Sequence, residues 1–148
     1  MRNGPAVAFG TSGDIPVPGD YVGDAYNEIA VFRPSNGTWY VQGGPTTQFG
    51  TFGDIPVPGD YFGTAKTDIA VFRPSTGTWY VQGDAAQFGT SGDIPVPGDY
   101  ALTTKTDIAV FRPSTGVWYV RGGSSTQFGA TGDIPVPLPT AIRRVFFP

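Results

Sequence analysis

Short apolar runs separated by turn residues recur along the chain, and each has the length of a β-strand. The run IAVFR at 29–33 is continuous, which is typical of a strand that is covered on both faces. The turn signal SNG at 35–37 and the strand-favouring run TWYVQ at 38–42 follow it. A fourth short strand is expected around residues 48–49 and ends at Gly50, after which the series of apolar runs restarts. These runs predict a hairpin followed by one more short strand.

A proline-containing run precedes each hairpin. The segment GDIPVPGDY at 13–21 recurs at 53–61 and 92–100 and begins again at 132. We expect a first strand over Ile15–Tyr21, although Pro16 and Pro18 would be unusual in a central strand. Alternate N–H groups of a strand point to the same side, so the prolines remove donors from one edge only. The run therefore predicts a strand that is paired on one side.

The pair Phe-Gly marks the period of the repeat. It occurs at Phe9, Phe49, Phe88 and Phe128, with spacings of 40, 39 and 40 residues. The missing residue falls where VQGGPTTQFG at 41–50 becomes VQGDAAQFG at 81–89, as a surface loop would tolerate. The chain therefore contains three full units and two partial ones.

Four antiparallel strands per unit of about 40 residues, with a first strand blunted by proline, are typical of one blade of a β-propeller. A β-helix has shorter coils, and a sandwich has no reason to repeat its sequence. We therefore expect an all-β fold, a single repeat array over residues 1–148. Its blades are expected at approximately 13–50, 53–89 and 92–129, with partial terminal strands at 5–10 and 132–148.

The terminal fragments predict assembly. Propellers close with about four to eight blades, so three blades leave open edges, and an exposed edge invites pairing with another chain. We expect two chains to share terminal strands and complete a ring of roughly six to eight blades. The last residues, 143–148, could echo the strand at 29–34 in shortened form. The prediction is a homo-oligomer, with a dimer favoured, or a subunit of a larger assembly.

Composition agrees with an all-β chain and excludes several kinds of site. The chain has 22 Gly and 15 Pro, which are costly inside helices. Nine scattered Lys and Arg residues and a net charge of −3 argue against a nucleic-acid partner. Without Cys or His, no disulfide, thiolate or imidazole metal site, Cys nucleophile or His-based triad can form.

No apolar run approaches 18 residues, which argues against membrane insertion, and residues 1–4 do not read as a signal peptide.

The aromatic residues of the third strands allow two interpretations. Trp39-Tyr40 recurs as Trp79-Tyr80 and Trp118-Tyr119. Adjacent side chains of a strand face opposite sides, so both rings of a pair could pack against neighbouring blades, which is the interpretation we favour. Alternatively, such rings could stack on the apolar face of a sugar.

The Phe-Gly pairs, the GDIPVPGDY strand, the loop after it and DIAVFRPSTGTWYV at 68–81 resemble the FG-GAP or VCBS-type repeats of integrin-alpha-like β-propellers. The resemblance covers nearly the whole chain. It implies an extracellular or periplasmic location, and some similar propellers are lectins, so a glycan partner is possible.

The resemblance also implies a calcium loop of the form D-x-D-G-D-G-x-x-D between the first two strands. Here the third loop position is Val22, Phe62 or Ala101, and only the first loop keeps a carboxylate at the fifth, Asp24. Lys66 and Lys105 add positive charge to the later loops. We expect no metal or other cofactor, although the set Asp20, Asp24 and Glu28 leaves calcium open in the first loop. The first aspartates, Asp20, Asp60 and Asp99, are expected to accept backbone hydrogen bonds as scaffold turns.

Charged residues that recur in every unit have a structural explanation. Asp14, Asp54, Asp93 and Asp133 follow glycine at each unit's start, and Arg33, Arg73 and Arg112 end each second strand. A catalytic carboxylate pair is conceivable, but identical copies point to what every unit needs. If the Asp and Arg residues pair at the surface, each pair contributes roughly 0.2–1 kcal/mol. We predict no catalytic, cofactor-binding or metal residues.

Three functions fit these observations. The first is a non-enzymatic structural or interaction module that assembles with itself or with a larger complex. The second is a carbohydrate-binding, lectin-like propeller with shallow sites between blades. The third is an engineered or truncated piece of a longer propeller. An enzyme is a further hypothesis with little support, because no carboxylate has a special placement in the sequence.

Overall fold

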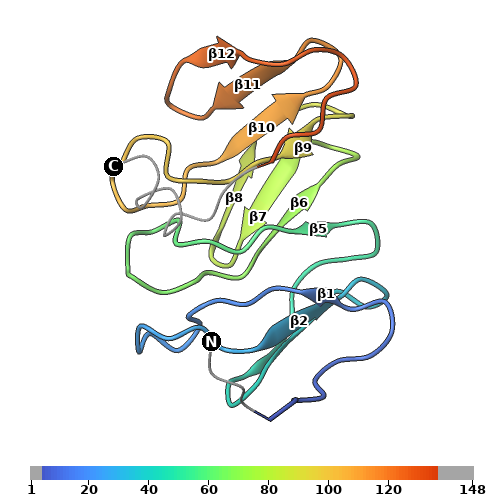
Figure 1. Ribbon diagram of the computed structural model, residues 1–148, viewed down its shortest axis with the longest axis vertical. Coiled ribbons are helices and arrows are strands. Elements are labelled where there is room, and N and C mark those ends of the chain that lie inside the picture. Colours follow the sequence, from blue (N-terminus) through green and yellow to red (C-terminus); the bar gives the residue numbers. More distant parts are fainter. Residues whose placement is uncertain (1–4, 137–148) are drawn as a thin grey trace.

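The computed structural model describes residues 5–136, which form three four-stranded antiparallel sheets stacked along the long axis of the molecule (Figure 1). The first sheet has the order β1 (Ile15–Pro16), β2 (Ala30–Arg33), β3 (Thr38–Val41) and β4 (Thr46–Gln48). The second contains β5 (Ile55–Pro56), β6 (Ala70–Arg73), β7 (Thr78–Val81) and β8 (Asp84–Gln87). The third contains β9 (Ile94–Pro95), β10 (Ala109–Arg112), β11 (Val117–Val120) and β12 (Ser125–Gln127).

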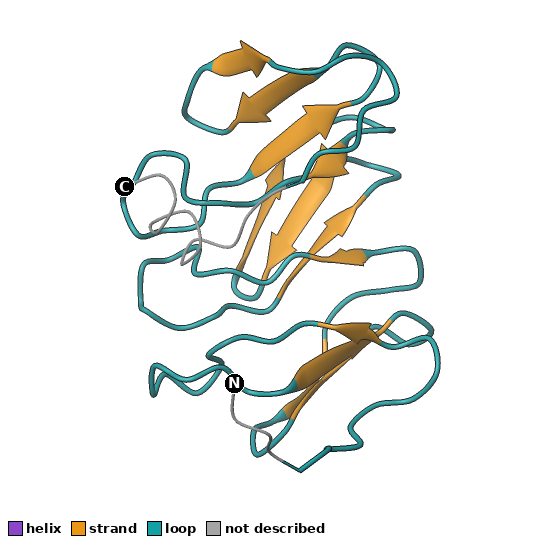
Figure 2. Ribbon diagram, in the orientation of Figure 1, coloured by secondary structure: helices purple, strands orange, loops and turns teal. Residues whose placement is uncertain are grey.

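The chain is all-β in this part, as predicted, and the sheets are blade-like. Residues 5–136 contain strands and loops but no helix (Figure 2), and so none that is long and apolar enough to cross a membrane. Each sheet lies within one of the three sequence units, and each repeats the same strand order.

The first strand of each sheet is shorter than predicted. Only Ile15–Pro16 forms a ladder with β2, after which the Val17 N–H donates to the Ala30 carbonyl at 2.9 Å and Gly19 forms an isolated bridge with Glu28. The ladder is interrupted because proline has no N–H to contribute. The one-sided pairing is confirmed, since β1, β5 and β9 each lie at the edge of their sheet.

The register of the central hairpin sorts the apolar side chains onto two faces. Phe32 lies opposite Trp39, and Val31 lies opposite Tyr40. Because successive side chains of a strand alternate between faces, Phe32 and Trp39 share one face while Val31 and Tyr40 share the other. The same register recurs in the second and third sheets. We call the face of each sheet that carries the Phe32 and Trp39 positions its aromatic face. We call the opposite face, which carries the Val31 and Tyr40 positions, its aliphatic face.

The hairpin turn requires glycine. Gly37 has a φ of +66° and donates its N–H to the Arg33 carbonyl at 2.9 Å. Its own carbonyl accepts the Phe49 N–H at 2.9 Å, which ties the turn to the Phe-Gly pair. A Cβ at this position would overlap the Gly50 carbonyl. The same overlap recurs at Gly77 and Gly116.

The core lies between the sheets. The aromatic face of the first sheet forms one buried cluster with Ile69 and Val71 from the second, and the aromatic face of the second forms another with Val110 from the third. Trp39 and Trp79 are completely buried. Each indole N–H donates at 2.9 Å to the carbonyl of the phenylalanine that ends its own unit. The period of the sequence is therefore the period of a stack in which each sheet covers the one before it.

Candidate functional site

The repeated Asp and Arg residues form one ion pair in each sheet. Arg33 donates from Nε and Nη2 to the two oxygens of Asp14, both at 2.9 Å. Its guanidinium also lies 4.5 Å from the ring centroid of Tyr40 and donates to the Tyr40 hydroxyl. The same triads recur in the other sheets as Asp54–Arg73–Tyr80 and Asp93–Arg112–Tyr119.

The pairs form, but the aspartate side of each is buried and so they are not fully exposed surface pairs. The side chains of Asp14, Asp54 and Asp93 are only 4%, 1% and 1% exposed, while the arginines are partly exposed. Hydrogen bonds from Arg33 hold the pKa of Asp14 at about 2. Burial raises the pKa of Asp54, but the hydrogen bonds from Arg73 and Thr51 and the Arg73 charge together outweigh it, so the pKa lies below its usual range. A carboxylate held ionised in a bidentate pair anchors the start of its sheet and is poorly suited to proton transfer.

The first loop gathers the three carboxylates that the sequence had left open for calcium. Asp20, Asp24 and Glu28 each offer an oxygen within 4.8 Å of the others. The carboxylate of Asp20 accepts the N–H groups of Gly23, Asp24 and Ala25, as expected for a scaffold turn. Asp60 and Asp99 accept N–H groups of their own loops in the same way.

The contacts in this loop fit a turn better than a calcium site. Glu28 accepts the N–H groups of Tyr21 and Val22, and Asp24 accepts that of Tyr26, so all three carboxylates already bind backbone donors. Calcium takes six to eight oxygen ligands. Burial raises the pKa of Asp20, but its backbone donors and the nearby Lys66 ammonium bring it below the usual range. The Lys66 side chain comes from the second unit, and its positive charge lies close to the position where a metal ion would bind.

Two inter-sheet joints were not predicted from the sequence. At the first, the Asp20 N–H donates to Thr67 Oγ1 at 2.9 Å, and the Thr67 N–H donates to the Asp20 carbonyl at 2.7 Å. At the second, Asp60 and Thr106 repeat both bonds at 3.0 and 2.7 Å. The available signal was the threonine two residues before the apolar run in the second and third units, where the first unit has Asn27. The joints show that the loops after the first strands connect neighbouring sheets.

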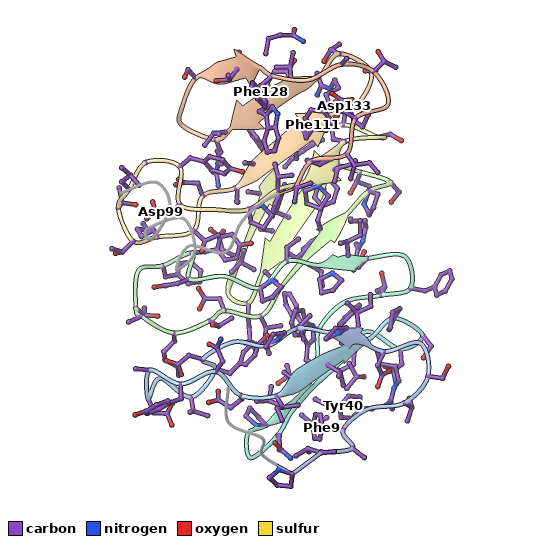
Figure 3. All side chains as sticks on the ribbon, viewed as in Figure 1. Phe9, Tyr40, Asp99, Phe111, Phe128 and Asp133 are labelled. Atoms are coloured by element: carbon purple, nitrogen blue, oxygen red, sulfur yellow. The ribbon has the colours of Figure 1, made fainter. Side chains whose placement is uncertain are left out.

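The third sheet leaves its aromatic face incompletely covered. Trp118 and Val120 are partly exposed, whereas their counterparts in the first two sheets are buried. Phe128 is 77% exposed. Figure 3 places Phe111 and Phe128 together on this sheet, at the far end of the molecule from Tyr40. The stack therefore ends on an apolar surface.

The repeated tryptophans do not support sugar stacking. The rings of Trp39 and Trp79 lie in the core, as the packing interpretation predicted, and Tyr40 is covered by Arg33 on one face. Two equivalent clefts do lie between neighbouring sheets. One is lined by residues that include Tyr21, Val41, Lys66, Asp68 and Ile69, and the other by Tyr61, Val81, Lys105, Asp107 and Ile108.

The predicted terminal strands are not part of these sheets. Residues 5–10 and 132–136 form no strand, and residues 137–148, with the predicted echo at 143–148, lie outside the described part of the chain. No family model, curated protein or solved structure matched the chain in comparisons with known proteins.

Proposed function

We propose that this chain is a non-enzymatic structural module, a partial β-propeller that assembles with copies of itself or within a larger complex. The observation that carries the proposal is the unfinished core at the third sheet. The same aromatic face is buried by a following sheet at two places in the chain, and at the third place Trp118 is partly exposed and Phe128 is 77% exposed. A surface of this kind is stabilised by removal from water.

The remaining features agree with a structural role. The recurring carboxylates are occupied by arginine or by loop N–H groups, which leaves no acid–base pair of special placement among them. The resemblance to FG-GAP and VCBS-type repeats supports a β-propeller and an extracellular or periplasmic location. Closure of the ring through a homodimer is the form of assembly we favour.

The mass of the full chain in solution tests this proposal. Light scattering at micromolar concentration is expected to give a multiple of 15.6 kDa, with twice that value for the dimer. A mass of 15.6 kDa at every accessible concentration would overturn self-assembly and favour an isolated fragment of a longer propeller.

Carbohydrate binding is a second candidate because the two clefts are equivalent in position and lining. Each combines tyrosine and aliphatic side chains with a lysine and an aspartate, which could contact the apolar face and the hydroxyls of a sugar. Repeated weak sites would gain avidity on a multivalent glycan. A glycan array followed by titration with the best sugar tests it, and no response at millimolar sugar would dispose of it.

A further inference from the structure

We infer that the first sheet of one copy packs head-to-tail against the third sheet of a second copy, repeating the interface that occurs twice inside the chain. The inference rests on the proposed self-assembly and names its two surfaces. The aromatic end face consists of Phe111, Trp118, Val120 and Phe128 on the third sheet. The aliphatic end face consists of Ile29, Val31 and Tyr40 on the first sheet.

The two internal interfaces define what each surface binds. At the first, Ile69, Val71 and Tyr80 of the second sheet pack against the cluster that contains Trp39 and Phe49. At the second, the equivalent residues Ile108, Val110 and Tyr119 pack against the cluster that contains Trp79 and Phe88. An aliphatic face thus covers the preceding aromatic face both times. The aromatic end face has the residues that an aliphatic face covers at both internal interfaces, so a third aliphatic face could pack against it in the same way.

The matching aliphatic face of the first sheet is open at Ile29, whereas Val31 is 8% exposed and lies beside Gly10. Ile29 is 43% exposed, whereas Ile69 at the same position of the second sheet is 6% exposed. Val31 and Tyr40 are cross-strand partners, as are Val71 and Tyr80. The first sheet therefore carries the same three residues that cover an aromatic face inside the chain.

The loops at the two ends depart from the repeat in a complementary way. Inside the chain, Gly23 lies against the Lys66 stem and Gly63 against the Lys105 stem. The third loop has Leu102 at the glycine position, and the first loop has Tyr26 at the lysine position. Both are largely exposed, at 77% and 75%. In a head-to-tail contact these two side chains meet, so an apolar pair replaces glycine and lysine only at the joint between copies.

If two copies pack as the internal sheets do, the segment at Gly129 of one chain and the segment at Gly10 of the other overlap at the position that Gly50 has in the first internal interface. A Cβ on Gly50 would contact both Phe32 and Val71, so this glycine lies in the first internal interface. Between copies, Gly129 of one chain and Gly10 of the other would occupy that place. The segment after Gly10 is held by the Asp14–Arg33 pair.

The segment after Gly129 is held less firmly. Residues 130–136 are largely exposed, and Asp133–Val136 leave a cavity of about 380 Å³ over the aromatic end face. We therefore expect Gly129 and residues 130–136 to move aside when a second copy docks, because Gly10 of that copy takes the same place.

The two surfaces lie on opposite ends of the stack, which makes the contact heterologous (Figures 1 and 3). Such contacts close into a ring when the rotation between copies allows it and otherwise form a filament. Two chains that each supply both surfaces would form a ring with two identical interfaces.

Cysteine cross-linking tests the pairing directly, because the chain has no cysteine of its own. Ile29→Cys and Val120→Cys place one thiol on each end face of the full chain. The matched control is Val41→Cys with Ile69→Cys, the equivalent pair in the first internal interface, which should form a disulfide within one chain. A mixture of the Ile29→Cys and Val120→Cys proteins should give a disulfide-linked dimer under mild oxidation, and neither protein alone should give one.

The outcomes separate this inference from the proposed function. If Ile29→Cys cross-links to itself, or if the mixture gives no dimer while the wild-type chain still self-associates, the head-to-tail interface is wrong but assembly stands. If the wild-type chain does not self-associate, the proposed function fails as well. The cross-link should survive deletion of residues 140–148. Its loss would show that shared terminal strands carry the assembly, and its appearance only after deletion would show that the tail covers the aromatic end face.

Discussion

Asp14, Asp54 and Asp93 each fix the start of a sheet through one carboxylate. Besides the arginine, the Asp54 carboxylate accepts the Thr51 N–H at 2.9 Å, so it ties the Gly-Asp turn to the end of the second strand. The identical copies at Asp14 and Asp93 follow from the same need in every unit. Repetition here reflects packing rather than chemistry.

The ion pairs predict acid lability. The pKa of Asp14 is about 2 in the fold against an ordinary value of 3.8, and those of Asp54 and Asp93 are also lowered. The lowered pKa contributes stability above the unfolded value, and this contribution is lost as pH falls from about 4 towards 2. Denaturant unfolding at a series of pH values should show that loss. A free energy of unfolding that stays flat across this window would contradict the role given to the pairs.

Removing one arginine should cost more than a surface pair would. Arg73→Ala leaves the buried Asp54 carboxylate without its main donors, so we expect a loss of about 1–3 kcal/mol in the free energy of unfolding. Arg121→Ala, which removes an exposed guanidinium, is the matched control and should change it little. Equal effects of the two substitutions would mean that the Asp54–Arg73 pair is energetically a surface pair after all.

The third loop contains a residue that its backbone disfavours. Leu102 has a φ of +57°, where Gly23 and Gly63 stand in the other units. A left-handed conformation costs an ordinary residue roughly 1–2 kcal/mol, and glycine avoids this cost. Glycine also loses more conformational entropy on folding, which offsets part of the gain in stability. At concentrations where the chain is monomeric, Leu102→Gly should raise the Tm slightly, and Gly23→Ala should lower it. A lower Tm for Leu102→Gly would show that its side chain makes stabilising contacts within the monomer.

At the level of the strand, the sequence predicted the edge strands and the faces but not the joints. Pro16 and Pro18 identified the one-sided strand because a missing N–H is a local property. The alternation of Trp39 and Tyr40 placed them on opposite faces for the same reason. Thr67 was missed because its partner, Asp20, is 47 residues away in sequence. Trp118 has nearly the same neighbours in sequence as Trp79, with Val117 in place of Thr78, and its exposure follows from its place at the end of the stack.

Equivalent isoleucines in different sheets should differ in what they stabilise. Ile69 is buried in the first internal interface, so Ile69→Ala should lower the free energy of unfolding by about 2–4 kcal/mol. Ile29→Ala should change unfolding of the dilute chain by less than about 1 kcal/mol, because that side chain is already half exposed. Denaturant titration of both variants at one low concentration measures the difference. A large loss for Ile29→Ala under those conditions would show that Ile29 packs within its own chain.

For the whole molecule, the stack has two unlike ends, and each carries the surface that the other lacks. The internal interfaces show that equivalent surfaces of neighbouring sheets pack against each other within one chain. Assembly between chains requires no new kind of contact. It requires that the third aromatic face find an aliphatic face on another copy.

Sedimentation equilibrium of the wild-type chain beside Ile29→Asp tests this account most directly. Ile55→Asp is the matched control, since Ile55 is similarly exposed but lies on the middle sheet, away from both end faces. We predict twice 15.6 kDa at micromolar concentration for the wild type and Ile55→Asp, and 15.6 kDa for Ile29→Asp. A wild-type chain that remains at 15.6 kDa throughout would contradict the central claim of self-assembly.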